Sequence, residues 1–297
     1  MYLDIPYTLT RSDADLYVEQ VGPEDGPVIF YLHGGPGYNS HSFRDLIGED
    51  LDRYRMIYAD QRGSGRSYAS ADFTINDLAD DIQTTLDTLE IESASLLAHG
   101  FGAQIAIRAA GTFPTRISGL ILVSPWFSMP LLTRTLQRLA ATLSGRVEQA
   151  LPPEEVLDAT GAPDPAEVIA QAFEWVNPKQ LFDTLEFPNP AARLRLEYSD
   201  STALLGPHAS GELIDPWELD ALAELDRLGL PLVILAGKDD RTVVPDQLEA
   251  GLRRTPGALM SLLEGGHYPW LDDPETFLNL LGKITDRPRE WGTNRAS

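Results

Sequence analysis

The stretch Ala98-His99-Gly100-Phe101-Gly102 lies between two segments of contrasting pattern. The residues before it, Ser93 to Ala98, form an apolar run that we interpret as a buried strand. Those after it, Ala103 to Ala110, are rich in small residues and favour a helix that packs closely on a sheet. A sharp strand-turn-helix is therefore predicted, with Gly100 at its apex and small residues on either side.

Strand and helix patterns alternate on both sides of this turn. Asp15 to Val21 and Val28 to Leu32 read as strands joined by a turn cluster of glycine and proline, which predicts a hairpin at the start of the fold. Further strands are predicted at Arg55 to Tyr58, Leu120 to Val123, Leu232 to Ala236 and Leu259 to Leu263, and helices after the capping residue Thr74, over Gln247 to Leu252 and from Pro274 to about Ile284. This rhythm favours an α/β fold with a mostly parallel sheet and helices on both faces. Ligands of such folds bind at the carboxyl ends of the strands.

The middle of the chain has a different pattern. From Ser124 to about Arg227, prolines recur and helical stretches alternate with breaks. We interpret residues 124–227 as a helical cap inserted into a single core made of residues 1–123 and 228–297. A chain of 297 residues can bury such a core.

Composition narrows the classes of partner. Lys and Arg total 23 against 45 Asp and Glu, so the formal net charge is -22. This charge repels nucleic acid and anionic membranes, and it attracts a cationic ligand such as a peptide amine. Residues 1–20 contain no sustained apolar stretch, so we expect neither a secretory signal nor a membrane span, and a cytoplasmic protein. Nothing in the sequence fixes the oligomeric state.

Composition also narrows the chemistry. The chain has no cysteine, which excludes thiolate nucleophiles, disulfides and cysteine metal sites. Its five histidines have no metal-ligand spacing, so no metal is expected. The glycine-rich segments at Gly63 and Gly100 lack the third glycine of a dinucleotide fingerprint, and no cofactor is expected.

The turn at Gly100 has the form of the nucleophile elbow G-x-S-x-G, except that glycine stands where the elbow carries serine. A second loop, His33-Gly34-Gly35-Pro36-Gly37, follows the strand that ends at Leu32. A backbone N–H of Gly34 or Gly35, together with that of Phe101, can stabilise a developing oxyanion. Either loop, taken alone, is also consistent with an ordinary tight turn.

Two further side chains follow strands on the same predicted edge of the sheet. Asp240 follows the strand that ends at Ala236, with Asp239 as the alternative, and His267 follows the last strand. Their chain order after Gly100 is the order of acid and histidine in α/β hydrolases. Alone, each would more often be a capping or surface residue.

Several segments together resemble the α/β-hydrolase fold and, within it, the proline iminopeptidase group. They are His33 to Gly37, Asp60-Gln61-Arg62-Gly63-Ser64-Gly65-Arg66-Ser67, Gly237 to Arg241 and Gly266-His267-Tyr268-Pro269-Trp270. The resemblance implies that His267 is the general base, that Asp240 orients it, that Gly35 and Phe101 are the oxyanion donors, and that the cap selects the substrate. It also implies Ser-His-Asp hydrolysis of N-terminal prolyl or small aminoacyl amides and esters, hence a small-molecule or short-peptide ligand under the cap.

The sequence departs from this group at the apex and in the cap. The group's Trp-x-x-Trp-Glu stretch is represented only by Glu174-Trp175. We take Gly34, Trp126 and Glu174 as candidate substrate-binding residues.

Because Gly100 cannot form an acyl-enzyme, we expect covalent hydrolysis to be lost or strongly impaired. The incomplete catalytic triad leaves three alternatives open. The chain is a small-molecule-binding pseudoenzyme, a non-covalent hydrolase or lyase that uses a water or a proton transfer at His267, or a serine aminopeptidase inactivated on purpose. Ser95, inside a strand, and Ser124, after a different strand, do not replace the missing nucleophile.

Overall fold

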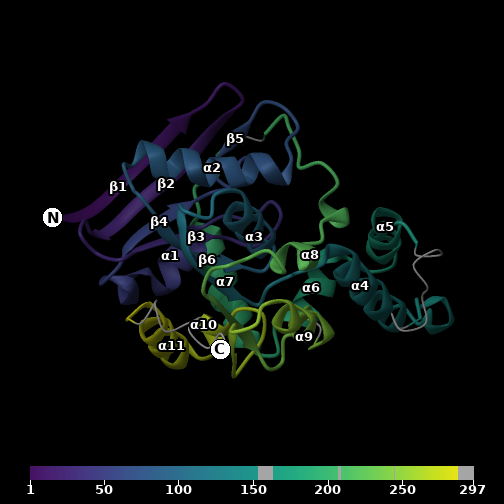
Figure 1. Cartoon of the computed structure of the whole chain (residues 1–297). Coiled ribbons are helices and arrows are strands. Elements are labelled where there is room, and N and C mark those ends of the chain that lie inside the picture. The colour runs from purple at the N-terminus through teal and green to yellow at the C-terminus, as the bar shows by residue number, and fades with distance from the viewer. Residues whose placement is uncertain (153–162, 207–208, 244, 287–297) are drawn as a thin grey trace.

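We describe residues 1–152, 163–206, 209–243 and 245–286 in a computed structural model (Figure 1). The strands are β1 (Tyr2–Thr10), β2 (Ala14–Pro23), β3 (Val28–Leu32), β4 (Arg55–Ala59), β5 (Tyr68–Ala69), β6 (Ala94–His99), β7 (Ile117–Val123), β8 (Leu232–Gly237) and β9 (Leu259–Leu263). The helices are α1 (His41–Ile47), α2 (Ile75–Thr88), α3 (Gly102–Thr112), α4 (Met129–Leu143), α5 (Pro165–Trp175), α6 (Pro178–Glu186), α7 (Pro190–Thr202), α8 (Leu222–Leu225), α9 (Pro245–Arg254), α10 (Pro269–Asp272) and α11 (Pro274–Asp286). Short 3-10 turns lie at Gly48–Leu51, Val147–Gln149 and Pro216–Glu218.

The strands form one mixed sheet in the order β1-β2-β4-β3-β6-β7-β8-β9, and β5 adds to β2. Pairing is parallel from β4 to β9 and antiparallel around β2. The predicted α/β class with a mostly parallel sheet is therefore confirmed. All the parallel strands point the same way, so their carboxyl ends share one edge.

The predicted hairpin between Asp15–Val21 and Val28–Leu32 is wrong. β2 instead forms a hairpin with β1, and β4 lies between β2 and β3. Most side chains of β1 are exposed, so it lacks the apolar run that would have marked it as a strand. The turn chemistry at Gly22 to Pro27 marks where a strand ends, but the choice of its partner depends on long-range packing.

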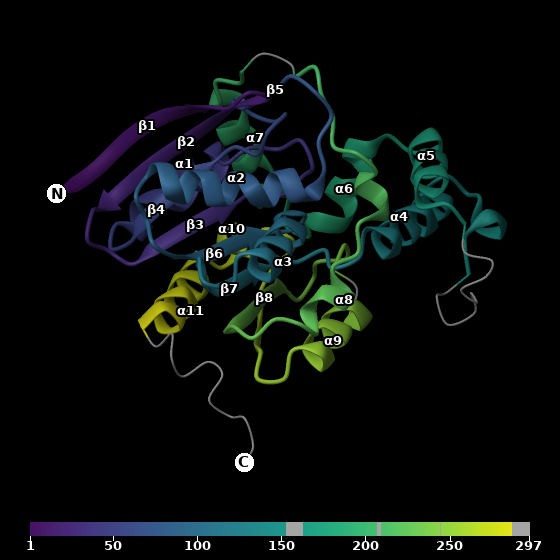
Figure 2. The same cartoon turned by 45° about the horizontal axis from the view of Figure 1, so that its top comes forward.

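Side chains of β3 alternate between two cores, one on each face of the sheet. Phe30 and Leu32 face the core that α2 and α3 cover, whereas Ile29 and Tyr31 face the core that α1 and α11 cover. This alternation follows from the two-residue period of a strand. Figure 2 shows α2 and α3 side by side along their face.

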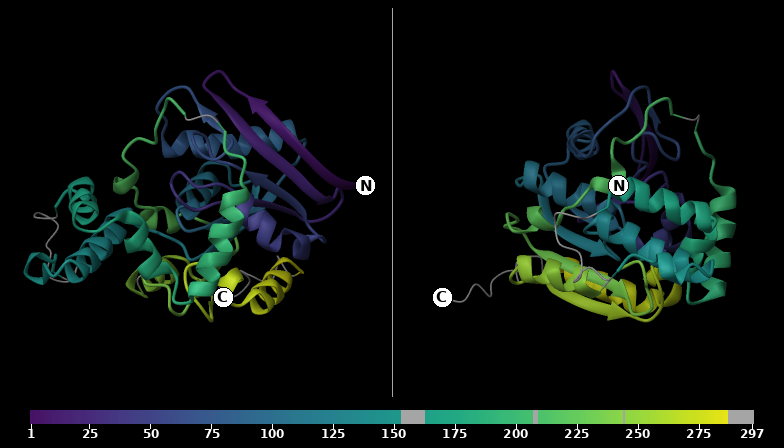
Figure 3. Two further views of the ribbon diagram at one scale, coloured as in Figure 1. Left: turned by 180° about the vertical axis from the view of Figure 1, so that it is seen from behind. Right: turned by 90° about the vertical axis from the view of Figure 1, so that its right-hand side faces the viewer.

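Between β7 and β8 the chain leaves the sheet and forms a helical insertion that includes α5–α7. α4 and α5 extend away from the sheet (Figures 1 and 3), while α7 returns to contact α1 and α10. The exact cap limits, 124 and 227, stay predictions, and residues 153–162 inside them lie outside the described residues.

Helix α2 begins at the predicted cap. Thr74 accepts a hydrogen bond from the Asp77 N–H, and the Asp77 carboxylate accepts one from the Thr74 N–H at 2.8 Å, which completes a capping box. This start fixes the loop that precedes α2 against the edge of the sheet where the strands end.

Candidate active site

The turn between β6 and α3 has the tight geometry that the sequence predicts. Gly100 has φ of +51°, in the left-handed region that glycine adopts at little cost. A Cβ on Gly102 would lie 2.6 Å from the Leu32 carbonyl oxygen, closer than a methyl group can approach. Only glycine at 102 therefore lets the start of α3 meet the end of β3.

The apex of this turn faces His267. A Cβ built on Gly100 would lie 3.0 Å from His267 Nε2 and 3.9 Å from the Gly34 Cα. The first glycine loop, the apex and the histidine, which are far apart in the sequence, thus lie together at one edge of the sheet.

His267 and Asp240 form a buried pair. His267 Nδ1 lies 2.8 Å from Asp240 Oδ2, and both side chains are at most 2% exposed. Thr242 donates to Asp240 Oδ1 from its hydroxyl at 2.6 Å and from its N–H at 2.9 Å. Asp239, the alternative acid, is exposed and does not reach the histidine. With Nδ1 held by Asp240, Nε2 is directed toward residue 100.

Electrostatics favour the ion pair in this dyad. Burial alone would lower the pKa of His267, but the carboxyl groups of Asp240 and Glu186 outweigh it and raise that pKa above its ordinary value. Burial alone would raise the pKa of Asp240, but His267 and the Thr242 hydrogen bonds bring it below its ordinary value. Asp240 is therefore a carboxylate at neutral pH and stabilises an imidazolium on His267.

Two backbone amides are available near the apex. Gly35, with φ of +125°, and Phe101, directly after the apex, carry the predicted oxyanion donors. In the described part of the chain neither N–H donates to a protein acceptor. Both groups can therefore donate to a ligand.

The structure brings two of the three candidate substrate-binding residues to this place. The Trp126 ring stacks on His267 with centroids 5.1 Å apart, and its Nε1 donates to Thr242 Oγ1 at 3.0 Å. Gly34 lies beside the apex. Glu174 instead sits on the exposed side of α5, and no contact with Asp240 or His267 is found for it within the described ranges.

Glu186, which the sequence analysis did not single out, is the last residue of α6 and only 7% exposed. His267 N–H donates to its carbonyl oxygen at 2.9 Å. Its carboxyl group has no hydrogen bond or ion pair with the residues that the structure describes. Burial, together with the nearby charges of Asp240 and Asp183, raises the pKa of Glu186 to about 7, although His267 and Arg193 oppose the rise. Its only sequence signal is an acid between Leu185 and Phe187.

His99 is a second buried group whose contacts no sequence pattern indicates. Its Nε2 lies 3.0 Å from the His267 carbonyl oxygen, and the two rings are 4.5 Å apart. Burial, with His267 nearby, holds the pKa of His99 well below its usual range. A neutral His99 therefore donates to the His267 backbone and holds that residue in place.

Among the residues that the structure describes, no three His, Cys, Asp or Glu side chains gather as metal ligands would. Within the same ranges, no helix combines the length and apolar character needed to cross a bilayer.

Comparison with known proteins shows the family to which the chain belongs. The profile of the α/β hydrolase fold family matches residues 27–274, and the chain belongs to this family. The chain is related more narrowly to proline iminopeptidases. A proline iminopeptidase-related protein of Thermus thermophilus is 34% identical, with a TM-score of 0.80 over 96% of this chain and 98% of that chain.

Two other relatives are more distant. The proline iminopeptidase of Mycobacterium smegmatis shares the fold, with 20% identity and a TM-score of 0.64 over 95% of this chain and 98% of that chain. The magnesium-chelatase 30 kDa subunit of Rhodobacter capsulatus is 28% identical over 85% of this chain and 84% of that protein.

Proposed function

We propose that this protein binds N-terminal prolyl or small aminoacyl amides or esters, and that it has lost covalent serine hydrolysis. The observation that carries the proposal is the position of residue 100. A Cβ built on Gly100 would lie 3.0 Å from His267 Nε2, so a serine here could donate its hydroxyl proton to that nitrogen. Gly100 supplies no such oxygen. Removing the serine from a Ser-His-Asp triad lowers turnover about a million-fold.

The remaining groups support a slower, non-covalent reaction. A water that entered the space beside residue 100 would lie within reach of His267 Nε2. As its oxygen attacks the carbonyl carbon, its proton passes to His267, and the Gly35 and Phe101 N–H groups stabilise the oxyanion. The C–N or C–O bond then breaks, and the imidazolium returns the proton to the leaving group. Asp240 stabilises the charged histidine throughout.

The buried carboxyl group of Glu186 is the evidence that the ligand carries an amine. A carboxyl group that is 7% exposed and has no partner in the described part of the chain is costly when ionised, and an ammonium group would remove that cost. We therefore assign amine recognition to Glu186 in place of Glu174, which is exposed.

The test compares the natural protein with Gly100→Ser and, as a control, Gly100→Ala on prolyl and alanyl 4-nitroanilides. We expect Gly100→Ser to gain at least about a thousand-fold in kcat/KM and Gly100→Ala to gain nothing. In the serine background, Glu186→Gln should raise KM for these substrates and leave N-acetylated analogues unchanged. Equal rates in the natural protein and Gly100→Ser would overturn the proposal. Binding without turnover in Gly100→Ser would show that the rest of the site does not support acyl transfer and would leave only the ligand-binding part of the proposal.

A further inference from the structure

A cavity of about 240 Å³ adjoins the elbow, because Phe101 is one of the residues that line it. Its lining includes Pro36, Phe73, Phe101, Leu213 and Pro216. Gly100, Trp126, Glu186 and His267 do not line it. The cavity therefore shares Phe101 with the candidate active site, and neither member of the His267–Asp240 dyad lines it.

The walls of the cavity are held in place by the backbone. The segment that returns from the insertion pairs with the loop before α2, through a parallel bridge between Phe73 and Leu213. Phe73 N–H donates to the Glu212 carbonyl oxygen at 3.0 Å, and Ile214 N–H donates to the Phe73 carbonyl oxygen at 2.8 Å. A site with fixed walls loses little conformational entropy when a ligand binds.

Apart from the Glu212 carboxylate, the charged and polar side chains in the walls already have partners. Arg62 makes two hydrogen bonds to Asp81 at 2.6 and 2.7 Å and a third to Asp13 at 2.6 Å. Gln61 donates to the His33 carbonyl oxygen at 2.7 Å. Glu212 is exposed, so water screens its charge. Arg62 is therefore not free to bind an anion, and apart from Gln61, Ser64 and Glu212 the other side chains that line the cavity are apolar.

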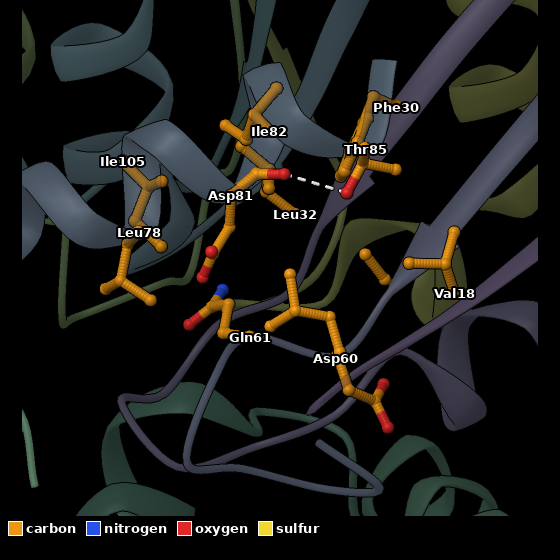
Figure 4. Close-up of a pocket in the computed structure, with 12 residues that line it drawn as sticks. Val18, Phe30, Leu32, Asp60, Gln61, Leu78, Asp81, Ile82, Thr85 and Ile105 are labelled. Carbon is orange, nitrogen blue, oxygen red and sulfur yellow. Dashed lines mark hydrogen bonds between the residues drawn. The ribbon is translucent and has the colours of Figure 1, made fainter. Parts of the chain in front are cut away.

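The size of the cavity sets the size of the group it can hold. A dry apolar cavity of about 150 Å³ is enough for benzene, so 240 Å³ accommodates a ring with a short substituent. A neighbouring cavity, also bordered by Gln61 and Leu78, measures only about 20 Å³. Figure 4 shows the residues that line it, with the Gln61 amide and the Asp81 carboxylate turned toward one another. That space fits one water molecule and no ligand group.

We propose that the cavity beside Phe101 is a subsite for a neutral apolar or aromatic group of the ligand. This inference rests on the proposed function, because Phe101 is one oxyanion donor and Pro36 directly follows the other, Gly35, so the two link the subsite to a carbonyl bound there. The ligand class is thereby narrowed to molecules with an amine at one end, a central carbonyl and an uncharged apolar group beyond it.

The test measures binding of benzamide to the natural protein by titration with ligand-observed NMR, with benzoate as the anionic comparison. Leu213→Trp should fill the cavity and weaken benzamide binding at least about tenfold. Ile214→Trp, on the neighbouring residue, which is 46% exposed and does not line the cavity, should leave binding unchanged. Benzoate should bind more weakly than benzamide.

A second variant, Leu213→Ala, keeps the subsite testable if Leu213→Trp does not fold. Leu213→Ala enlarges the cavity and should shift the preference from benzamide toward 2-naphthamide. Benzamide binding that is absent, or that is the same in Leu213→Trp and Ile214→Trp, would overturn the subsite. These measurements involve no turnover, so they fail independently of the Gly100→Ser assay.

Discussion

Gly100 separates two properties that a serine at this position would combine. The backbone of the elbow and its alignment with His267 are retained, while the reactive oxygen is absent. Glycine also relaxes the turn, because a residue with a Cβ at φ of +51° is strained. A serine at this position would therefore bring the hydroxyl and the backbone strain together.

Gly100→Ser should therefore lower the free energy of unfolding by about 1–2 kcal/mol, even as it adds the hydroxyl. The new Cβ lies 3.0 Å from His267 Nε2, so the imidazole must also shift slightly. Urea denaturation measures the change, with Gly111→Ser as the control, because nothing lies within 4 Å of a Cβ at that exposed position. Equal losses in the two variants would show that the elbow is not strained.

Glu186 should make stability depend on pH. Its pKa rises from 4.5 when unfolded to about 7 when folded, so the folded protein binds the extra proton between these values. The contribution of protonated Glu186 to the free energy of unfolding is fully present below about pH 4.5. It is lost as the pH rises through about 7, and the loss is as much as about 3 kcal/mol. Glu186→Gln should stabilise the protein at about pH 8 and have little effect at about pH 4.

The measurement for Glu186 is urea denaturation at both pH values, with exposed Glu174→Gln as the control. A Glu186→Gln variant that is less stable than the natural protein at the higher pH would mean that the carboxylate has a stabilising partner. That result would remove the argument for an unpaired acid beside the dyad.

The start of helix α2 helps to position one wall of the cavity beside Phe101. The capping box at Thr74 and Asp77 starts the helix directly after Phe73, which forms part of the cavity wall. Local chemistry at a helix end therefore sets the position of a wall of the proposed subsite.

Thr74→Ala should lower the free energy of unfolding by about 1 kcal/mol, because the Asp77 N–H loses its acceptor. Thr88→Ala, at the exposed far end of the same helix, should change it by less than about 0.5 kcal/mol. Thermal or urea denaturation distinguishes the two. An equal effect of both substitutions would show that the cap does not stabilise α2.

Elements with strong local signals were predictable from the sequence. The apolar runs of β6 and β8 and the periodic helix after Thr74 are fixed by their own residues. β1 was not, because its side chains are mostly exposed and its stability depends on pairing with β2. The true hairpin partner of β2 likewise depends on contacts that no local pattern records.

The candidate active site likewise has residues that the sequence predicts and residues that it does not. Gly100, Asp240 and His267 follow strands, and the parallel sheet brings strand ends together, so their convergence was predictable. The burial of Glu186 arises only when α6 folds over His267. His99 looked like an ordinary residue of the turn, and its contact with the His267 backbone required the three-dimensional arrangement.

The charge of the whole molecule should act on the approach of ligands. A net charge of -22 attracts cations over a distance that salt screens. In Gly100→Ser, kcat/KM for a prolyl 4-nitroanilide should fall several-fold as NaCl rises from about 10 mM to about 300 mM. The N-acetylated analogue should be insensitive to salt. Equal salt dependence for both would show that the field does not steer the amine.

The central claim is that the elbow, the dyad and the oxyanion donors are arranged for acyl transfer and lack one oxygen. Mass spectrometry after treatment with a fluorophosphonate tests it most directly. We predict that the natural protein stays unmodified, that Gly100→Ser gains a single adduct at residue 100, and that adding His267→Ala abolishes this adduct. An adduct on the natural protein, or a folded Gly100→Ser protein that stays unmodified, would contradict the account.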